Sequence, residues 1–184
     1  MASRAVPAPL QQLPNALTIA RLALIPVFVV LLLADSGGHS WPAAIVFGVA
    51  GVTDQVDGFL ARRWHVESKF GAVADPLADR LMIDAAVILL WWDGRLPWPA
   101  LAVILARDAL LLGGYKVVVP RGYEFSVSML GKASTWILYA SLGFVMVTHA
   151  GTVWPVALFW SGLALAVLAA ASYVAGAWRA VVRE

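Results

Sequence analysis

Residues 17–34 read LTIARLALIPVFVVLLLA, an apolar run that contains one charged side chain, Arg21. A helix needs about 20 consecutive, mostly apolar residues to cross the hydrocarbon core of a bilayer. This run therefore predicts a membrane-spanning helix from Leu17 to Ala34. We expect the helix to start after Pro14 and Asn15, which precede the apolar run.

Similar apolar segments continue along the chain and predict five more spans. They are Trp41–Arg62, Asp75–Trp92, Pro97–Val117, Gly131–Thr148 and Val153–Trp178. Of the 184 residues 61% are hydrophobic and 13% are charged, and the mean hydropathy is +0.82. A soluble domain of this size would need a more polar surface. We expect an all-α integral membrane protein with six transmembrane helices, forming one domain over residues 1–184 with a short N-terminal segment, residues 1–14.

Lysine and arginine indicate the orientation of these spans. They gather on alternate links, at Arg4, at Arg62, Arg63 and Lys69, at Lys116, Arg121 and Lys132, and at Arg179 and Arg183. The opposite links carry only Arg95. Cytoplasmic loops are the ones enriched in these residues, so both termini should be cytoplasmic and the protein should lie in the cell membrane. The net charge of +2 is too small to indicate a nucleic-acid partner, and the absence of cysteine excludes disulfides and thiolate sites.

Four carboxylates lie inside or beside two neighbouring predicted spans. Residues 53–87 read TDQVDGFLARRWHVESKFGAVADPLADRLMIDAAV. Asp54 and Asp57 are three residues apart, and Asp75 and Asp79 are four apart, so each pair shares one helix face. Charged groups in membrane spans are costly and usually functional. Because the two spans run antiparallel, both pairs should meet at one depth near the cytoplasmic side.

Four carboxylates at close range repel one another and need protons or cations. Oxygen ligands suit hard cations such as Mg²⁺, Mn²⁺ and Ca²⁺, and two such ions are a common device for phosphoryl transfer. The alternative is simple pairing of the acids with basic residues near the interface, but four acids at this spacing favour a metal site. The basic residues available for such pairing are Arg62, Arg63, Lys69 and Arg80.

The same stretch resembles the CDP-alcohol phosphotransferase family, whose pattern is D-x2-D-G-x2-A-R-x8-G-x3-D-x3-D. The matching positions are Asp54, Asp57, Gly58, Ala61, Arg62, Gly71, Asp75 and Asp79. The resemblance implies two divalent ions, Mg²⁺ or Mn²⁺, held by Asp54, Asp57 and Asp75, with Asp79 as the general base that also contacts metal. It implies a nucleotide site at Asp54, Gly58, Ala61, Arg62 and Gly71. It also implies a homodimer.

The reaction implied by this resemblance is attack of an alcohol on CDP-diacylglycerol within the membrane, with release of CMP. The segment FGAVADPLADRL is similar to the phosphatidylglycerophosphate synthase and cardiolipin synthase branch. The pair Arg107-Asp108, with Tyr115 where the first of these enzymes tends to carry a second arginine, favours phosphatidylglycerol as acceptor and cardiolipin as product. Glycerol 3-phosphate stays open as the alternative acceptor, because Lys116 can replace the missing arginine.

Four basic residues are candidates to hold the acceptor phosphate: Arg107, Lys132, Arg121 and Arg21. Each has an alternative role as an anchor at the membrane interface. Asp84 lies about one turn beyond Asp79, either as a supporting group or as a buried protonated acid. Two other classes of function are a cation transporter, in which the acids would form an ion pathway, and a membrane scaffold without catalysis.

Overall fold

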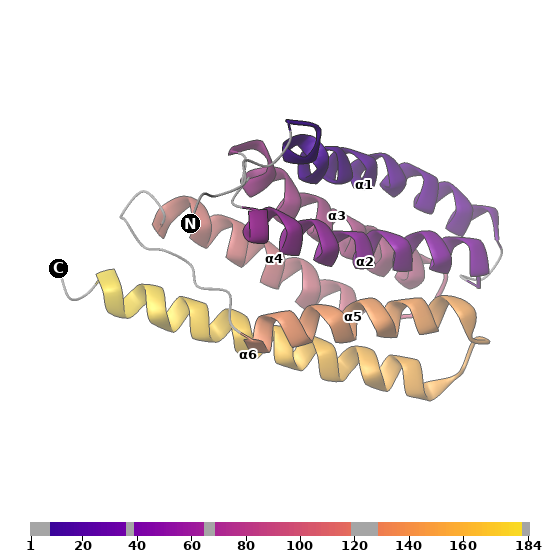
Figure 1. Cartoon of the computed structure of the whole chain (residues 1–184). Coiled ribbons are helices and arrows are strands. Elements are labelled where there is room, and N and C mark those ends of the chain that lie inside the picture. The colour runs from indigo at the N-terminus through magenta and orange to yellow at the C-terminus, as the bar shows by residue number, and fades with distance from the viewer. Residues whose placement is uncertain (1–7, 36–38, 65–68, 119–128, 182–184) are drawn as a thin grey trace.

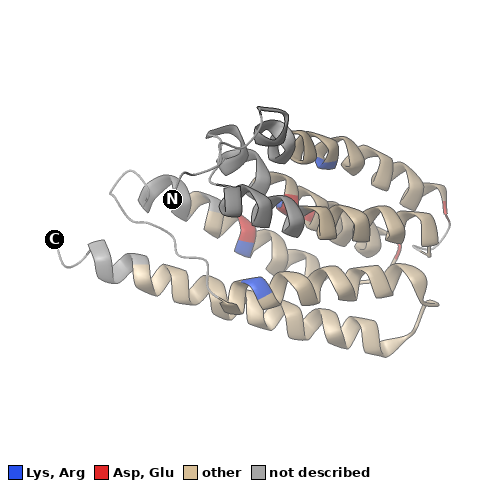
Figure 2. Cartoon of the chain, in the orientation of Figure 1, with Lys and Arg blue, Asp and Glu red and all other residues tan. Residues whose placement is uncertain are grey.

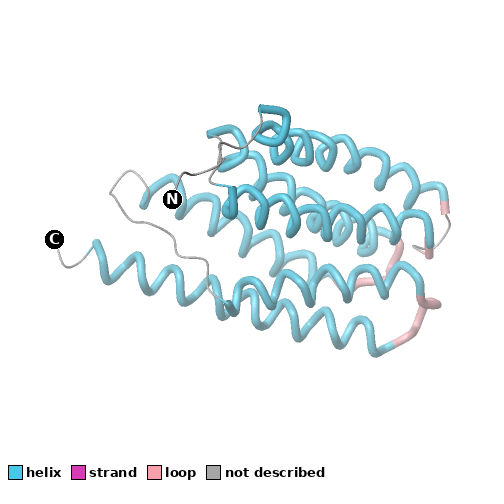
Figure 3. The backbone as a smooth tube through the Cα atoms, viewed as in Figure 1, coloured by secondary structure: helices cyan, strands magenta, loops and turns pink. Residues whose placement is uncertain are grey.

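The computed structural model describes the backbone of residues 8–35, 39–64, 69–118 and 129–181, and the side chains of residues 16–35, 39–53, 77–111, 113 and 129–176. Within these ranges the backbone is helical apart from short turns, and it contains no strand (Figure 3). Six helices follow one another along the chain (Figure 1). They are α1 (Ala8–Ala34), α2 (Trp41–Trp64), α3 (Lys69–Trp92), α4 (Trp98–Val118), α5 (Met129–Val147) and α6 (Val153–Val181).

Three of these helices contain segments that are long and apolar enough to cross a membrane. The segments are Ala16–Ala34, Met129–Val147 and Val153–Gly176, as found among the residues described. A shorter apolar segment, Trp41–Thr53, forms the first half of α2. An α-helix bonds its own backbone polar groups internally, which is why apolar surroundings favour it. The helical fold class expected from the sequence is thus confirmed, with a composition typical of membrane proteins.

Two helix starts differ from the sequence prediction. The predicted start of the first helix, after Pro14, is wrong, because α1 already begins at Ala8. Residues 10–13 read LQQL, and leucine and glutamine are good helix formers. The helix continues through Pro14, although a proline inside a helix removes one backbone hydrogen bond and its ring crowds the carbonyl group four residues before it. The third helix begins at Lys69 rather than Asp75. Both helices therefore extend beyond their apolar segments.

The helices form an antiparallel bundle in which α5 and α6 make the most extensive pair, followed by α1 with α2. The helix α4 packs mainly against α3 and α6. In Figure 1 the first helix begins and the last helix ends at the same end of the bundle. The sequence predicts a loop over residues 118–128, of which 119–128 lie outside the described residues. Val118 is the last residue of α4.

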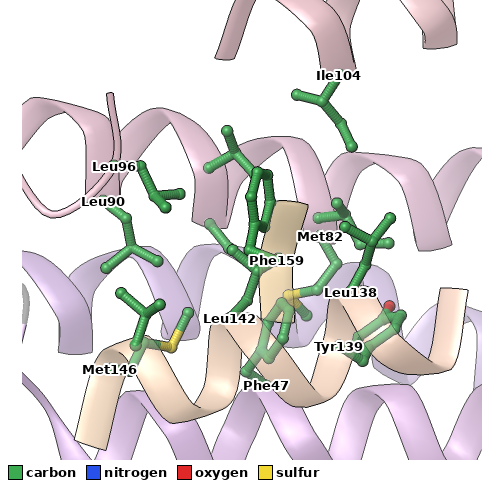
Figure 4. Close-up of a cluster of buried hydrophobic side chains, with 14 of the residues drawn as sticks. Phe47, Met82, Leu90, Leu96, Ile104, Leu138, Tyr139, Leu142, Met146 and Phe159 are labelled. Carbon is green, nitrogen blue, oxygen red and sulfur yellow. The ribbon is translucent and has the colours of Figure 1, made fainter. Parts of the chain in front are cut away.

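The core consists of aliphatic and aromatic side chains from all six helices (Figure 4). Phe28 of α1, Phe47 of α2 and Phe159 of α6 are completely buried. The rings of Phe28 and Phe47 lie 5.4 Å apart between their centroids. Aromatic contacts of this kind add to the packing of the apolar half of the bundle.

One end of the bundle, which we call the looped end, contains the turns around Asp35, Gly94 and Gly151. Gly94 and Gly151 have φ values of 70° and 85°, a backbone conformation that favours glycine. Arg95 donates hydrogen bonds to the carbonyl oxygens of Val145 and Thr148 at 2.5 and 2.7 Å, at the end of α5. These bonds join the α3–α4 turn to the C-terminus of α5, where free carbonyls need donors.

A second set of contacts ties the α1–α2 turn to the same place. The backbone N–H of Ser40 donates to the carbonyl oxygen of Met146 at 2.9 Å. The imidazole rings of His39 and His149 stack with centroids 5.4 Å apart. Burial lowers the pKa of the Arg95 guanidinium, and the charge of Asp93 acts in the opposite direction. The three turns of the looped end are therefore linked by polar contacts.

Gly162 lets α6 approach α5 closely, and we predict that its replacement by alanine destabilises the bundle. A Cβ at this position would lie 2.9 Å from Ile137 Cγ2 and 3.2 Å from the backbone nitrogen of Leu138. A Cβ at Gly143 would meet nothing within 4 Å. Relative to Gly143→Ala, Gly162→Ala should lower the free energy of unfolding by about 1–3 kcal/mol. Thermal unfolding of both variants in detergent, followed by circular dichroism, measures this difference, and equal stabilities would contradict it.

Candidate active site

The charged residues that the structure describes within the helices lie in one part of the bundle (Figure 2). Among residues with described side chains, those within the helices are Arg21, Asp79, Arg80, Asp84, Arg107, Asp108 and Lys132. We call the part of the bundle that contains these residues the polar layer. Between the polar layer and the looped end the helices are apolar, as Trp41–Thr53 of α2 illustrates. Buried charges in apolar surroundings need partners. The buried charged residues of the polar layer are therefore expected to contact one another.

Asp79 of α3 lies where four helices bring polar groups together. The hydroxyl of Tyr139, on α5, donates a hydrogen bond of 2.7 Å to Asp79 Oδ1. The charges of Arg21, Arg80 and Asp108 are close enough to act on the Asp79 carboxylate. Arg21 of α1 is only 1% exposed, although the rest of α1 from Leu22 to Ala34 is apolar. The structure thus brings together two residues that the sequence nominated for separate roles, Asp79 and Arg21.

A second group of charges joins α3 to α4, and we call it the ion-pair cluster: Arg80, Asp84, Arg107 and Asp108. Asp108 is 3% exposed and pairs with Arg80 Nη1 at 3.3 Å and with Arg107 Nη1 at 2.5 Å. Asp84 lies beside Asp108 on the α3 side of the cluster. Its Oδ1 and the Nε of Arg107 are buried without a hydrogen-bond partner among the described residues.

An open groove of about 680 Å³ runs between α4 and α6 beside this cluster. Among the described residues that line it, Arg107 is the charged one and the others are alanine, valine or leucine. We call it the α4–α6 groove; residues that line it include Val103, Ala106, Arg107, Leu110, Ala171 and Val174. It combines long apolar walls with a guanidinium group, which is the chemistry of a site for a molecule with both an apolar tail and an anionic group.

For most of the other site residues predicted from the sequence, the structure describes the backbone or nothing. Lys132 is exposed in the first turn of α5. Asp54, Asp57, Gly58, Ala61 and Arg62 belong to α2, and Gly71 and Asp75 belong to α3, but their side chains lie outside the described residues. Arg121 also lies outside them. The described side chains, which do not include those of Asp54, Asp57 and Asp75, contain no group of three or more acidic or histidine residues that could hold a metal ion.

The donor set nevertheless suits a hard divalent cation. Each of the four predicted ligands offers carboxylate oxygens, which Mg²⁺ and Mn²⁺ prefer. A carboxylate has about four lone-pair sites, so the single bond that Asp79 accepts from Tyr139 leaves room for a cation or a proton donor. Asp79 is therefore compatible with both roles expected of it, ligand and base.

Sequence reasoning did not find Tyr139 or the partner of Arg80. The signal for Tyr139 was a hydroxyl within the apolar helix α5, because a buried tyrosine hydroxyl usually finds a hydrogen-bond partner. Arg80 was considered only as a neutralising group for nearby acids, whereas it pairs with Asp108 on the next helix. Neither partner could be chosen without knowing how the helices are rotated against one another.

The sequence matches a known protein family. Residues 11–170 match the family model of the CDP-alcohol phosphatidyltransferases. The chain belongs to this family. Members transfer a substituted phosphate group from a CDP-activated donor to an alcohol, so the chain is a transferase of phospholipid synthesis.

Individual relatives of this transferase carry two kinds of name. A CDP-diacylglycerol–glycerol-3-phosphate 3-phosphatidyltransferase of Bacillus subtilis is 38% identical over 67% of this chain and 70% of its own length. A "probable phosphatidylglycerophosphate synthase" of Mycobacterium tuberculosis is 34% identical over 91% of the chain and 82% of its own length. A CMP-forming cardiolipin synthase of Streptomyces coelicolor is 41% identical over 70% of the chain, but over only 62% of its own length.

We predict that Asp108→Ala strongly destabilises the transferase, because it leaves Arg80 and Arg107 without their shared carboxylate. Breaking a buried ion pair by removing one partner costs about 3–5 kcal/mol. The exposed Asp35, at the end of α1, provides the matched control. Unfolding of Asp108→Ala and Asp35→Ala in detergent should differ by this amount, and similar midpoints for the two variants would contradict the prediction.

Proposed function

We propose that the chain transfers the phosphatidyl group of CDP-diacylglycerol to phosphatidylglycerol, forming cardiolipin and releasing CMP. The observation that carries the choice of acceptor is the α4–α6 groove with Arg107 in its wall. Phosphatidylglycerol has a phosphate and two acyl chains, whereas glycerol 3-phosphate has no apolar part to place against alanine, valine and leucine. Because the lipid and the groove both lie in the bilayer, this match rests on van der Waals packing of acyl chains against the groove walls and not on transfer from water.

Arg107 supports this proposal through its free donor. Its Nη1 is bonded to Asp108, while its buried Nε has no hydrogen-bond partner among the described residues. A phosphate oxygen at that position would remove the cost of an unsatisfied buried donor. The ion-pair cluster also links Arg107 through Asp108 to Arg80, the neighbour of Asp79 in sequence. The acceptor phosphate would thus bind near the proposed base; Lys132, Arg121 and Arg21 are the further candidates to contact it.

In the proposed topology all six helices span the membrane, with both termini and the polar layer on the cytoplasmic side. This follows from the distribution of lysine and arginine along the sequence. The bundle has a matching asymmetry, since charged residues of the helices lie away from the looped end. We further propose that two copies form a homodimer, as expected from the family resemblance. Other membrane lipids would surround the apolar faces.

In the proposed mechanism the four acids of the family pattern act together. Two divalent cations, Mg²⁺ or Mn²⁺, held by Asp54, Asp57, Asp75 and Asp79 would neutralise the diphosphate of the donor and the charge of the leaving CMP. Asp54, Gly58, Ala61, Arg62 and Gly71 would bind the cytidine nucleotide.

Asp79 then accepts the proton of the acceptor hydroxyl as that oxygen attacks the phosphatidyl phosphorus. A new oxygen–phosphorus bond forms and the bond to the CMP oxygen breaks. CMP leaves with the bonding electron pair. Arg21 and Arg107 orient the phosphate of the acceptor during this step.

Glycerol 3-phosphate is the second candidate acceptor, and the names of the relatives from B. subtilis and M. tuberculosis favour it. Family membership argues against the cation transporter and scaffold alternatives, because the matched family consists of transferases.

The acceptor is tested by measuring CMP release from CDP-diacylglycerol with purified protein and Mg²⁺ or Mn²⁺. We expect release with phosphatidylglycerol, accompanied by cardiolipin, and little with glycerol 3-phosphate. Asp79→Ala should abolish turnover while binding of the metal partly survives, because three of the four proposed ligands stay in place. Release with glycerol 3-phosphate alone would overturn the choice of acceptor, and no release with any alcohol would overturn the proposed activity.

The groove itself is tested by filling it. Ala171 is an exposed residue of its wall, and Ala171→Phe should lower kcat/KM for phosphatidylglycerol by about tenfold or more, since small steric changes in apolar pockets have effects of this order. Ala164 is exposed on the same helix but does not line the groove, so Ala164→Phe is the control. An unchanged KM for phosphatidylglycerol in Ala171→Phe would show that the groove does not hold this substrate.

A further inference from the structure

Tyr139 makes a hydrogen bond between helices, unlike the buried hydroxyl groups beside it. Its hydroxyl reaches from α5 to Asp79 Oδ1 on α3, at 2.7 Å. Ser134 and Ser141 of the same helix are also buried, but their hydroxyls donate to Gly131 O and Leu138 O within α5. The bond from Tyr139 is directed at the residue proposed to accept a proton. A bond to an ionised group is also shorter and stronger than one between neutral groups.

The ring of Tyr139 has little freedom to move. The side chain is 9% exposed, and its ring centroid lies 4.8 Å from that of Phe47 on α2 (Figure 4). Phe47 is supported in turn by Phe28 of α1. The ring also lies against Gly51, one turn after Phe47 on α2, where a Cβ would stand 2.7 Å from Tyr139 Cδ1 and 2.8 Å from Cε1. Three helices therefore determine where the hydroxyl points.

We propose that Tyr139 is the positioning residue of Asp79, holding its carboxylate in the orientation that receives the acceptor's proton. This inference rests on the proposed function. The terminal torsion of an aspartate is broad and has no strong intrinsic preference, so an external contact is needed to fix it. A base must lie within hydrogen-bond distance of the proton it removes. Tyr139 keeps its own proton throughout, and the proton of the acceptor goes to Asp79.

The contact with Gly51 is part of the same device. The absence of a side chain at this position allows the Tyr139 ring to lie directly against the α2 backbone. A methyl group there would push the ring away and move the hydroxyl relative to Asp79 Oδ1. Gly51 also lies three residues before Asp54 on α2. The helix that carries two predicted metal ligands thus also sets the position of the tyrosine.

The direct test is Tyr139→Phe, which keeps the ring and removes the hydroxyl. We expect kcat for CMP release to fall by about 10- to 100-fold, because small misplacements of catalytic groups have effects of this size. KM for CDP-diacylglycerol and the Mg²⁺ concentration for half-maximal activity should not change. The unfolding midpoint should fall, because a buried hydrogen bond is lost, but kcat should stay low in assays run far below that midpoint. The assay uses whichever acceptor supports turnover of the wild-type protein, so its outcome does not depend on the identity of that acceptor.

A second variant moves the hydroxyl without removing it. Gly51→Ala should lower kcat by a similar factor, whereas Gly48→Ala, where a Cβ would meet nothing within 4 Å, should not. In the Tyr139→Phe background Gly51→Ala should lower kcat little further, because the group that it displaces is already gone. A full additional loss there would mean that Gly51 acts through α2 itself and would overturn this part of the inference.

Three other results would overturn the positioning role. They are a wild-type kcat in Tyr139→Phe, a loss of kcat that saturating Mg²⁺ restores, and a loss of kcat that disappears when the assay is run far below the unfolding midpoint of the variant. The second would assign the hydroxyl to support of a metal ligand, and the third to stability alone. Failure of the proposed function is distinct, since wild-type protein itself would then release no CMP with any alcohol, and the inference would fall with it.

Discussion

The carboxylate of Asp108 holds two arginines, Arg80 from α3 and Arg107 from its own helix, in the polar layer of a bundle whose core is apolar. Such groups lose their hydration on burial, and they are tolerated only when neighbouring helices supply partners with opposite charge. This requirement determines how α3 and α4 meet, because α4 has few other attachments to the bundle. The apolar core fills the space around these ion pairs. The ion pairs form at only one rotation of α3 and α4 about their own axes.

The helix α3 connects two polar systems through adjacent residues. Asp79 interacts with Tyr139 on α5 and with the charge of Arg21 on α1, whereas Arg80 pairs with α4. Consecutive helical residues point about 100° apart, so one turn of α3 serves both neighbours. Under the proposed function, the donor and the acceptor would be bound on different sides of this helix, close to each other.

Much of this architecture was predictable from the sequence, and the rest was not, for physical reasons. Long apolar runs such as Leu17–Ala34 predicted six helices, and the spacing from Asp54 to Asp79 predicted the family that the comparison confirmed. The start of α1 was missed because Pro14 suggested a beginning where the helix in fact continues. Tyr139 and Asp79 are 60 residues apart. Periodicity along one helix contains no information about which residue of another helix will face it.

The polar contacts at the looped end have a mechanical consequence. Arg95, Ser40 and the stacked imidazoles of His39 and His149 bind three turns to one another. Helices of 24 residues, such as α2 and α3, are about 36 Å long, so a small tilt about a fastened end becomes a much larger displacement at the opposite end. A tilt of the helices about the looped end would therefore displace the polar layer more than the apolar packing beside the turns.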